Sequence, residues 1–129
     1  MNERILLVDD DPVVCFTVEV IFRKTNIEVL SAHSGTEALR CLESGFKGLI
    51  LMDVMMPGMD GWETIEAIVD KGLMEGNIIC MLTAVDSPSP KLEKLKEHVL
   101  EYIRKPFHPN DLVAAVAQYL QLVPQELGT

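Results

Sequence analysis

Five short apolar runs alternate along the chain with longer segments of helical periodicity. Two of the runs, Ile27–Ser31 and Leu100–Arg104, mix polar with apolar residues and are predicted to be edge strands. The other three are almost continuously apolar, which is typical of strands covered on both faces of a parallel sheet. These three predicted central strands are Ile5–Val8, Gly48–Met52 and Ile78–Leu82.

A segment with helical spacing of its apolar residues follows each predicted strand. Ser34 can cap the second of these segments, and His108-Pro109 places a proline near the first turn of the fifth, where a missing N–H is tolerated. The predicted helices are Val13–Lys24, Thr36–Glu43, Trp62–Lys71, Lys91–His98 and Asp111–Leu122. Five strand-helix units predict an α/β fold, a doubly wound five-stranded parallel sheet with the flavodoxin-like order 2-1-3-4-5 and five helices.

Length and charge narrow the domain organisation and the classes of partner. The 129 residues suffice for one domain with a core, so we expect a single domain over residues 1–122 and a short tail over 123–129. A net charge of -9 argues against direct nucleic-acid binding, which depends on clustered Lys and Arg. No apolar stretch resembles a signal sequence or approaches the roughly 18 residues of a membrane span. We therefore expect a cytoplasmic protein with neither a membrane nor a nucleic acid as its partner.

Charged and hydroxyl side chains lie at the carboxyl ends of four of the predicted strands. In chain order they are Asp9, Asp10, Asp11, Asp53, Thr83 and Lys105. Because the carboxyl ends of parallel strands lie along one edge of the sheet, these groups are predicted to meet in one pocket. Any one of them could be an ordinary surface residue, but their joint placement is hard to attribute to chance.

The expected chemistry of this pocket follows from its carboxylates. Carboxylates a few ångströms apart repel one another and need protons or a cation to coexist. An oxygen-only set of ligands with open positions suits Mg²⁺, and with Mg²⁺ present one carboxylate can act as a nucleophile toward phosphorus. Lys105 and Thr83 are then candidates for contacts with the phosphoryl oxygens.

Four strings carry a resemblance to a known family: ILLVDDD, LMDVMMPGMDG, MLTA and YIRKPF. In this order they resemble the receiver domain of response regulators in two-component signalling, over about Arg4–Leu122. The resemblance, closest to stand-alone chemotaxis regulators, implies a phosphoryl-accepting switch and not an enzyme, with at most weak self-phosphorylation from small donors and self-dephosphorylation. It implies a sensor histidine kinase or a histidine phosphotransfer domain as donor, an unknown downstream protein target, and a monomer or a phosphorylation-dependent dimer.

The resemblance also implies roles for individual acidic residues. Asp53 would accept the phosphoryl group. Asp10 would bind Mg²⁺ directly and Asp9 would hold a metal-bound water, while Asp11 would lie outside the metal shell. Asp53 itself and the backbone carbonyl of Met55 would supply further metal ligands.

The same resemblance implies a phosphoryl-binding set and a switch. Lys105, the Thr83 hydroxyl and the backbone of Ala84 would bind the phosphoryl group. As Thr83 is drawn toward that group, Tyr102 would rotate inward and remodel the face formed by the fourth helix, the fifth strand and the fifth helix. The Lys105-Pro106 bond is expected to be cis.

The first helix carries two apolar stripes, and a solvated helix rarely does. The stripe predicted to be buried consists of Val14, Thr17, Val18 and Ile21. Val13, Phe16 and Val20 then point elsewhere, and we hypothesise that Phe16 and Val20 dock the helices of the phosphoryl donor. Burial of this second stripe under neighbouring elements is the alternative.

Two further positions are expected to control how long the phosphoryl group remains. In this family, the side chains two residues after the phosphorylated Asp and two after the switch Thr flank the path of attacking water. Here they are Met55 and Val85, which cannot hydrogen-bond a water and are large enough to crowd its path. This predicts slow self-dephosphorylation, unless both side chains point away and merely pack.

Two other functions remain open from the sequence. The string DDDPV also fits the D-x-D-x-V motif of haloacid-dehalogenase-like Mg²⁺-dependent phosphatases, with Asp9 as nucleophile and Asp11 as acid/base. That interpretation leaves Asp53 and the MPGMDG loop unexplained. A receiver-like scaffold that binds partners without phosphorylation is the other alternative.

Overall fold

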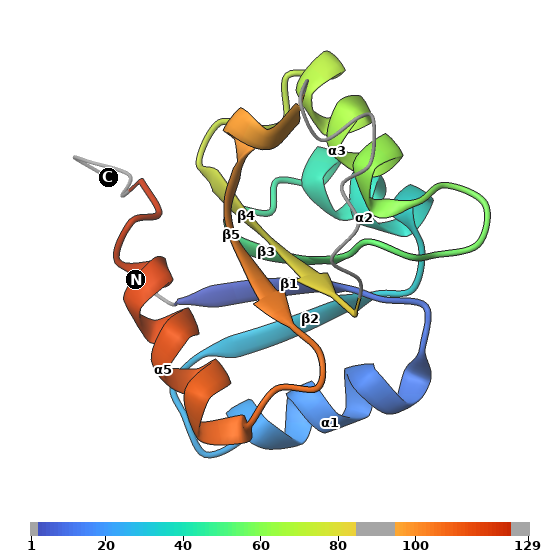
Figure 1. Cartoon of the computed structure of the whole chain (residues 1–129). Coiled ribbons are helices and arrows are strands. Elements are labelled where there is room, and N and C mark those ends of the chain that lie inside the picture. Colours follow the sequence, from blue (N-terminus) through green and yellow to red (C-terminus); the bar gives the residue numbers. More distant parts are fainter. Residues whose placement is uncertain (1–2, 85–94, 125–129) are drawn as a thin grey trace.

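A five-stranded parallel sheet forms the centre of the described part of the chain, with α1 and α5 on one face and α2 and α3 on the other (Figure 1). The structure is a computed structural model that describes residues 3–84 and 95–124. The strand order is β2-β1-β3-β4-β5, and every neighbouring pair is parallel. The predicted doubly wound α/β fold and its strand order are therefore confirmed.

The five strands and all the predicted helices except Lys91–His98 lie within one or two residues of their predicted bounds. The strands are β1 (Arg4–Val8), β2 (Glu28–Ala32), β3 (Gly48–Asp53), β4 (Asn77–Thr83) and β5 (Val99–Arg104). The described helices are α1 (Pro12–Phe22), α2 (Gly35–Glu43), α3 (Gly61–Asp70) and α5 (Pro109–Leu120), with a 3-10 turn η1 (Lys96–His98) before β5. The predicted fourth helix begins outside the described residues, which contain only its end. None of the helices described is long and apolar enough to cross a membrane.

Short polar side chains fix where the helices begin. Ser34 caps α2, as predicted, by accepting a hydrogen bond from the N–H of Glu37 at 3.1 Å. Asp60 and Glu63 form a reciprocal capping box at the start of α3. Asp11 caps α1 by accepting a backbone N–H of its first turn at 2.9 Å. The Asp11 cap directly follows Asp9 and Asp10, and the Asp60 cap closes the loop that follows Asp53, so both caps fix the chain that leads away from these acidic residues.

The apolar core has one part on each face of the sheet. The α2/α3-side core includes the strand residues Leu6, Val8, Ile50, Met52, Ile79 and Met81, with Trp62 and Ile65 of α3. The α1/α5-side core includes Ile5, Leu7, Leu49, Leu51, Cys80 and Leu82, with Val18 of α1 and Val116 of α5. Successive residues of a strand belong to opposite cores because side chains alternate across a sheet. The continuous apolar runs predicted for the three central strands are explained by burial on both faces.

The packing of α1 corrects one detail of the predicted stripe. Its buried residues are Cys15, Val18 and Phe22, with Val14 and Ile21 half-buried. Thr17 is exposed, and its hydroxyl donates to the carbonyl of Val13 at 2.7 Å. The prediction that Thr17 is buried was wrong. Cys15, Val18 and Phe22, at the spacing i, i+3 and i+7, form the buried stripe, and Thr17 lies outside it on the solvent side.

Candidate functional site

The carboxyl ends of the strands surround an open cavity of about 510 Å³. The cavity is lined by Asp9, Asp10, Asp11, Pro12, Asp53, Met55, Ala84 and Lys105. The structure thus brings together groups that follow β1, β3, β4 and β5, as expected for the edge of a doubly wound sheet. Of the predicted set, Thr83 ends β4 beside this cavity without being one of its lining residues.

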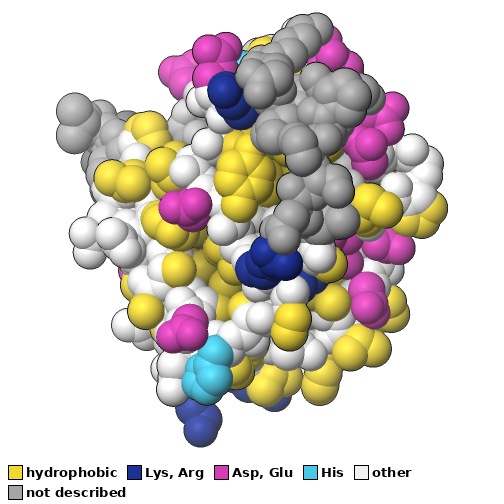
Figure 2. All heavy atoms as spheres, in the orientation of Figure 1, with side chains coloured by type: hydrophobic (Ala, Val, Ile, Leu, Met, Phe, Trp, Pro, Cys, Tyr) yellow, Lys and Arg dark blue, Asp and Glu magenta, His cyan; other side chains and the backbone are white. Residues whose placement is uncertain are grey.

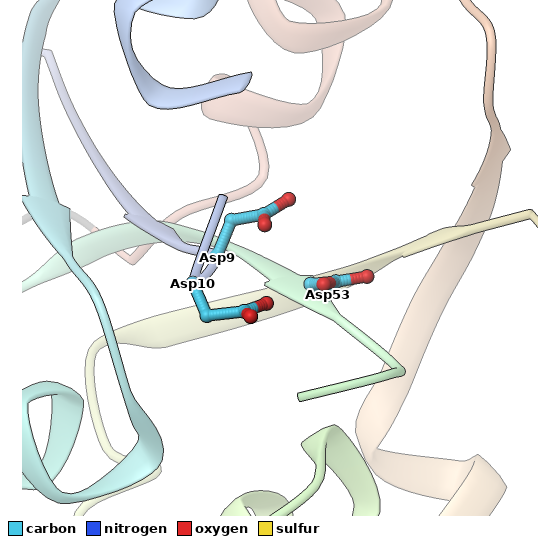
Figure 3. Close-up of side chains that lie close together, drawn as sticks. All are labelled: Asp9, Asp10 and Asp53. Atoms are coloured by element: carbon cyan, nitrogen blue, oxygen red, sulfur yellow. The ribbon is translucent and has the colours of Figure 1, made fainter. Parts of the chain in front are cut away.

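Three carboxylates gather in the cavity (Figure 3). Asp9 and Asp10 directly follow β1 and Asp53 ends β3, and one oxygen from each lies within 4.8 Å of the others. Asp9 and Asp53 are buried, whereas Asp10 is exposed. Such an oxygen-only cluster, open to solvent on one side, fits a hard divalent cation such as Mg²⁺.

Lys105 lies between the two buried carboxylates. Its Nζ donates to Asp9 Oδ2 at 2.8 Å and to Asp53 Oδ1 at 3.3 Å. Burial by itself lowers the pKa of Lys105, but the hydrogen bond to Asp9 and the charge of Asp53 outweigh burial and raise that pKa above its usual value. The ammonium therefore stays charged. The Lys105-Pro106 bond is cis, as predicted.

The surroundings of Asp53 disfavour its ionised form. Burial and then the charge of Asp9 raise the pKa of Asp53 to about 6, against the opposing effects of Lys105 and of the Met55 backbone N–H. A raised carboxylate pKa in an open cavity is a mark of a functional site. With this pKa, Asp53 is mostly ionised at neutral pH.

The loop after Asp53 turns sharply into α3. The N–H of Gly61 donates to the carbonyl of Val54 at 2.9 Å, and a Cβ at position 61 would collide with the carbonyl oxygen of Asp53. Gly58 has φ +76°, which favours glycine. The two glycines of the MPGMDG string therefore allow the chain to reverse immediately beside Asp53.

The predicted switch residues lie on the neighbouring strands β4 and β5. Thr83 is half-buried, and its carbonyl accepts the backbone N–H of Lys105 at 2.9 Å. Ala84, next in the chain, is exposed and lines the cavity. Tyr102 on β5 is 41% exposed, and its ring lies near that of Trp62.

For Trp62, a large apolar residue at the start of a predicted helix, the sequence favours packing in the core or at the helix cap and assigns no function. Its burial in the α2/α3-side core confirms that assignment. Its contact with Tyr102 was missed, because that contact depends on both the register of β5 and the position of α3. No local sequence signal reports these two features.

The second stripe of α1 is open to solvent. Val13 is 68% exposed, Phe16 61% and Val20 42%, so the expected exposure of Phe16 and Val20 is confirmed. Figure 2 shows hydrophobic surface at the lower right, where α1 lies in Figure 1. Met55, which lines the cavity, is 68% exposed. Val85, the other residue predicted to flank the path of water, lies outside the described residues.

Asp11 bears on the alternative phosphatase interpretation. Its side chain caps α1, and it is not part of the three-carboxylate cluster. Asp11 lines the cavity, but its carboxylate is engaged by the Val13 N–H at the start of α1, which favours a capping role over the acid/base role of the phosphatase motif.

Comparison with known proteins places the chain in a family. Residues 5–117 match the family described as the response regulator receiver domain. Regulatory protein VanR of Enterococcus faecium is 33% identical over 94% of this chain and 51% of its own length. The alkaline phosphatase synthesis transcriptional regulatory protein PhoP of Bacillus subtilis is 34% identical over 94% of this chain and 50% of its own length. The chain thus spans about half the length of these curated relatives.

Solved structures agree with this match. A CheY-like response regulator receiver domain protein from Methanospirillum hungatei has a TM-score of 0.90 and 41% identity, covering 95% of this chain and 98% of that one. Chemotaxis protein CheY4 of Vibrio cholerae has a TM-score of 0.80 and 30% identity, covering 96% and 100%. The sequence match, the strand order and the acidic cavity agree, and the chain belongs to the response regulator receiver domain family.

Proposed function

We propose that this chain is a signalling switch in which Asp53 accepts a phosphoryl group from a phosphohistidine donor. The observation that carries the proposal is the position of Asp53, which is buried at the end of β3, clustered with Asp9 and Asp10 and 3.3 Å from the ammonium of Lys105. This arrangement gives a nucleophilic oxygen a cationic partner and a set of metal-binding oxygens. Membership of the receiver family supports a phosphoacceptor of this class.

The proposed transfer exchanges one bond to phosphorus for another. A carboxylate oxygen of Asp53 forms the new O–P bond while the N–P bond of the donor breaks, and its electron pair stays on the histidine nitrogen. Lys105 neutralises charge on the transferred group, and the Thr83 hydroxyl and the Ala84 backbone N–H donate to its oxygens. The pKa of about 6 leaves Asp53 mostly ionised at neutral pH, as a nucleophile must be.

Four residues are proposed to hold Mg²⁺. Asp10, Asp53 and the backbone carbonyl of Met55 would bind it directly, and Asp9, which is paired with Lys105 in this structure, would bind it through a water. Bound there, Mg²⁺ would offset the repulsion between the carboxylates and the charge of the phosphoryl oxygens. The fit rests on the carboxylate cluster and on the position of Met55 in the cavity lining.

The signal is proposed to leave the site through Thr83 and Tyr102. A phosphoryl group adds charge and strong hydrogen-bond acceptors, which draw the Thr83 hydroxyl toward Asp53 and leave space for the Tyr102 ring. Rotation of that ring changes the face formed by β5, α5 and the segment before β5. A downstream protein, or a second copy of this chain, reads that face.

The donor is proposed to be a sensor histidine kinase or a histidine phosphotransfer domain. It docks its helices on the exposed apolar stripe of α1, where Phe16 and Val20 offer apolar surface on the helix whose first residue, Pro12, lines the cavity.

The proposal is tested by intact-mass measurement after incubation with acetyl phosphate, with Mg²⁺ or with EDTA. We expect one labile phosphoryl adduct per chain that depends on Mg²⁺ and is lost in Asp53→Asn. Asp70→Asn, which removes an exposed carboxylate at the end of α3, is the matched control and should retain the adduct. Equal labelling of the wild type and Asp53→Asn would contradict the proposal.

A further inference from the structure

Tyr102 has an aromatic neighbour that the phosphoryl-transfer chemistry does not use. The centroid of its ring lies 6.4 Å from that of Trp62, and the two ring planes are tilted by 45°. Rings at this separation and tilt attract each other beyond the effect of area burial. The two residues belong to different elements, since Tyr102 is on β5 and Trp62 is in the first turn of α3.

Trp62 is held rigidly and close to the phosphoacceptor loop. It is 5% exposed and packs in the α2/α3-side core, and a capping box fixes the start of its helix. Gly61, the residue before it, donates its N–H to the carbonyl of Val54, which directly follows Asp53. A short and well-packed path therefore joins the backbone at Asp53 to the ring of Trp62.

Tyr102 has, by contrast, a more open position than Trp62. It is 41% exposed and lies on β5, which is an edge strand of the described sheet. Its cross-strand neighbour on β4 is Met81, which belongs to the same core as Trp62. Among residues 3–84 and 95–124, the ring of Trp62 is the aromatic partner of Tyr102, and it holds one side of the Tyr102 ring.

We propose that Trp62 is a positioning residue for Tyr102, because its ring retains Tyr102 against α3 in the unphosphorylated protein. This inference rests on the proposed function, because the role of Tyr102 as a switch residue is part of that proposal. It adds a second connection between Asp53 and Tyr102, which runs through the first turn of α3 and not through Thr83. Trp62 thereby sets how readily the switch turns.

The expected effect follows from the strength of an aromatic pair. Loss of the pair corresponds to about a twofold to tenfold change in the population of the retained Tyr102 orientation. Trp62→Leu should produce this change, and Trp62→Phe, which keeps a ring, should produce a smaller one.

The two tyrosines of the chain make the test specific. In protein labelled with ¹³C in its tyrosine rings, Tyr102 reports on the pair, whereas Tyr119 of α5 packs on the α1/α5-side core and serves as an internal control. We expect Trp62→Leu to move the Tyr102 resonances toward their position in phosphorylated wild type, with Tyr119 unmoved. Tyr102 resonances that do not change, or that change together with those of Tyr119, would overturn the inference.

A second variant leaves the core intact in case Trp62→Leu folds poorly. Trp62 is the single tryptophan, so its emission should change in Tyr102→Leu and stay constant in Tyr119→Phe. Unchanged emission in Tyr102→Leu would contradict the ring contact. Phosphorylation is measured separately by intact mass. A wild type that forms no adduct at Asp53 would remove the proposed function, whereas a Trp62-dependent shift of Tyr102 in untreated protein would still establish the ring coupling.

Discussion

Two buried polar side chains at opposite ends of the sheet are satisfied in different ways. Asn77 begins β4, where its Oδ1 accepts the N–H of Gly48 at 3.0 Å and its Nδ2 donates to the carbonyl of Leu73 at 2.9 Å. Asp53 ends the neighbouring strand β3, where it faces the carboxylate of Asp9 and shares the ammonium of Lys105 with it.

This difference in hydrogen bonding distinguishes a side chain that stabilises the fold from one that is suited to bind a ligand. A neutral amide with partners on both polar atoms holds its neighbours in place and leaves little for a ligand to improve. The negative charges of two buried carboxylates are poorly compensated by one shared cation. A metal ion or a transferred phosphoryl group can therefore form favourable interactions there that the protein alone does not provide. The amino end of the sheet is thus organised for stability and the carboxyl end for binding.

The largest expected change in stability is at the amino end. In Asn77→Ala the Gly48 N–H and the Leu73 carbonyl lose a buried partner, and the free energy of unfolding should fall by about 3 kcal/mol. Chemical denaturation measures this, with Asn110→Ala as an exposed control. If the free energy of unfolding falls by less than about 0.5 kcal/mol, Asn77 does not stabilise the amino end of the sheet as this account requires.

At the carboxyl end, neutralising a charge should stabilise the protein. The pKa of Asp53, about 6, lies above its ordinary value of 3.8, so the native state holds this proton more tightly than the unfolded chain does. Stability is therefore lost as pH rises from about 4 to about 6. Asp53→Asn removes that loss and should be more stable than wild type at pH 7 in EDTA by about 2 kcal/mol, below the roughly 3 kcal/mol that the difference between 3.8 and about 6 represents, because the cavity is open to solvent.

The control for this prediction is the pH dependence of the difference itself. The gain of Asp53→Asn over wild type should be near zero at pH 4 and grow through pH 6, and Mg²⁺ should stabilise wild type more than the variant. A variant that is less stable than wild type at pH 7 in EDTA would show that Lys105 compensates Asp53 fully.

The apolar stripe of α1 should affect transfer without affecting stability. Phe16→Ala truncates a side chain that is 61% exposed, so the free energy of unfolding should change by about 0.5 kcal/mol or less. Transfer from a phosphohistidine protein donor should slow by about tenfold, as expected for loss of an apolar anchor, while labelling by acetyl phosphate stays unchanged. Thr17→Ala, exposed on the same helix, is the control. Equal slowing with both donors would place the effect in the cavity and not in docking.

The smallest expected effect concerns the lifetime of the phosphoryl group. If Met55 crowds the path of attacking water, Met55→Asn should shorten the lifetime several-fold, and Met55→Leu should preserve it. Decay of the adduct is followed by intact mass after removal of the phosphodonor. A lifetime in Met55→Asn equal to or longer than that of wild type would show that Met55 does not exclude water.

The sequence predicted the fold well because its central strands are buried on both faces and therefore read as continuous apolar runs. Most of the cavity residues could also be predicted, since the carboxyl ends of parallel strands lie along one edge of the sheet, but Thr83 was predicted there and does not line the cavity. Helix ends were less certain. The helix predicted over Val13–Lys24 ends at Phe22, and the one predicted from Asp111 begins at Pro109.

What the sequence missed depends on tertiary packing. Nothing in the local sequence shows that Asn77 joins two separate segments that precede it in the chain, at Gly48 and at Leu73, or that Trp62 meets Tyr102. The burial of Thr17 was predicted wrongly because two alternative apolar stripes on α1 differ only by a small rotation of the helix about its axis. Packing against the sheet decides which of the two is buried.

The most direct test of the central claim is to map the phosphoryl adduct to a residue. Protein labelled with acetyl phosphate is reduced with borohydride, which converts an acyl phosphate to a stable alcohol, and the site is found by peptide fragmentation. Three clustered carboxylates compete for the phosphoryl group, namely Asp9, Asp10 and Asp53. We predict modification of Asp53 alone. Modification of Asp9, or Mg²⁺-dependent labelling that leaves Asp53 unmodified, would contradict the claim.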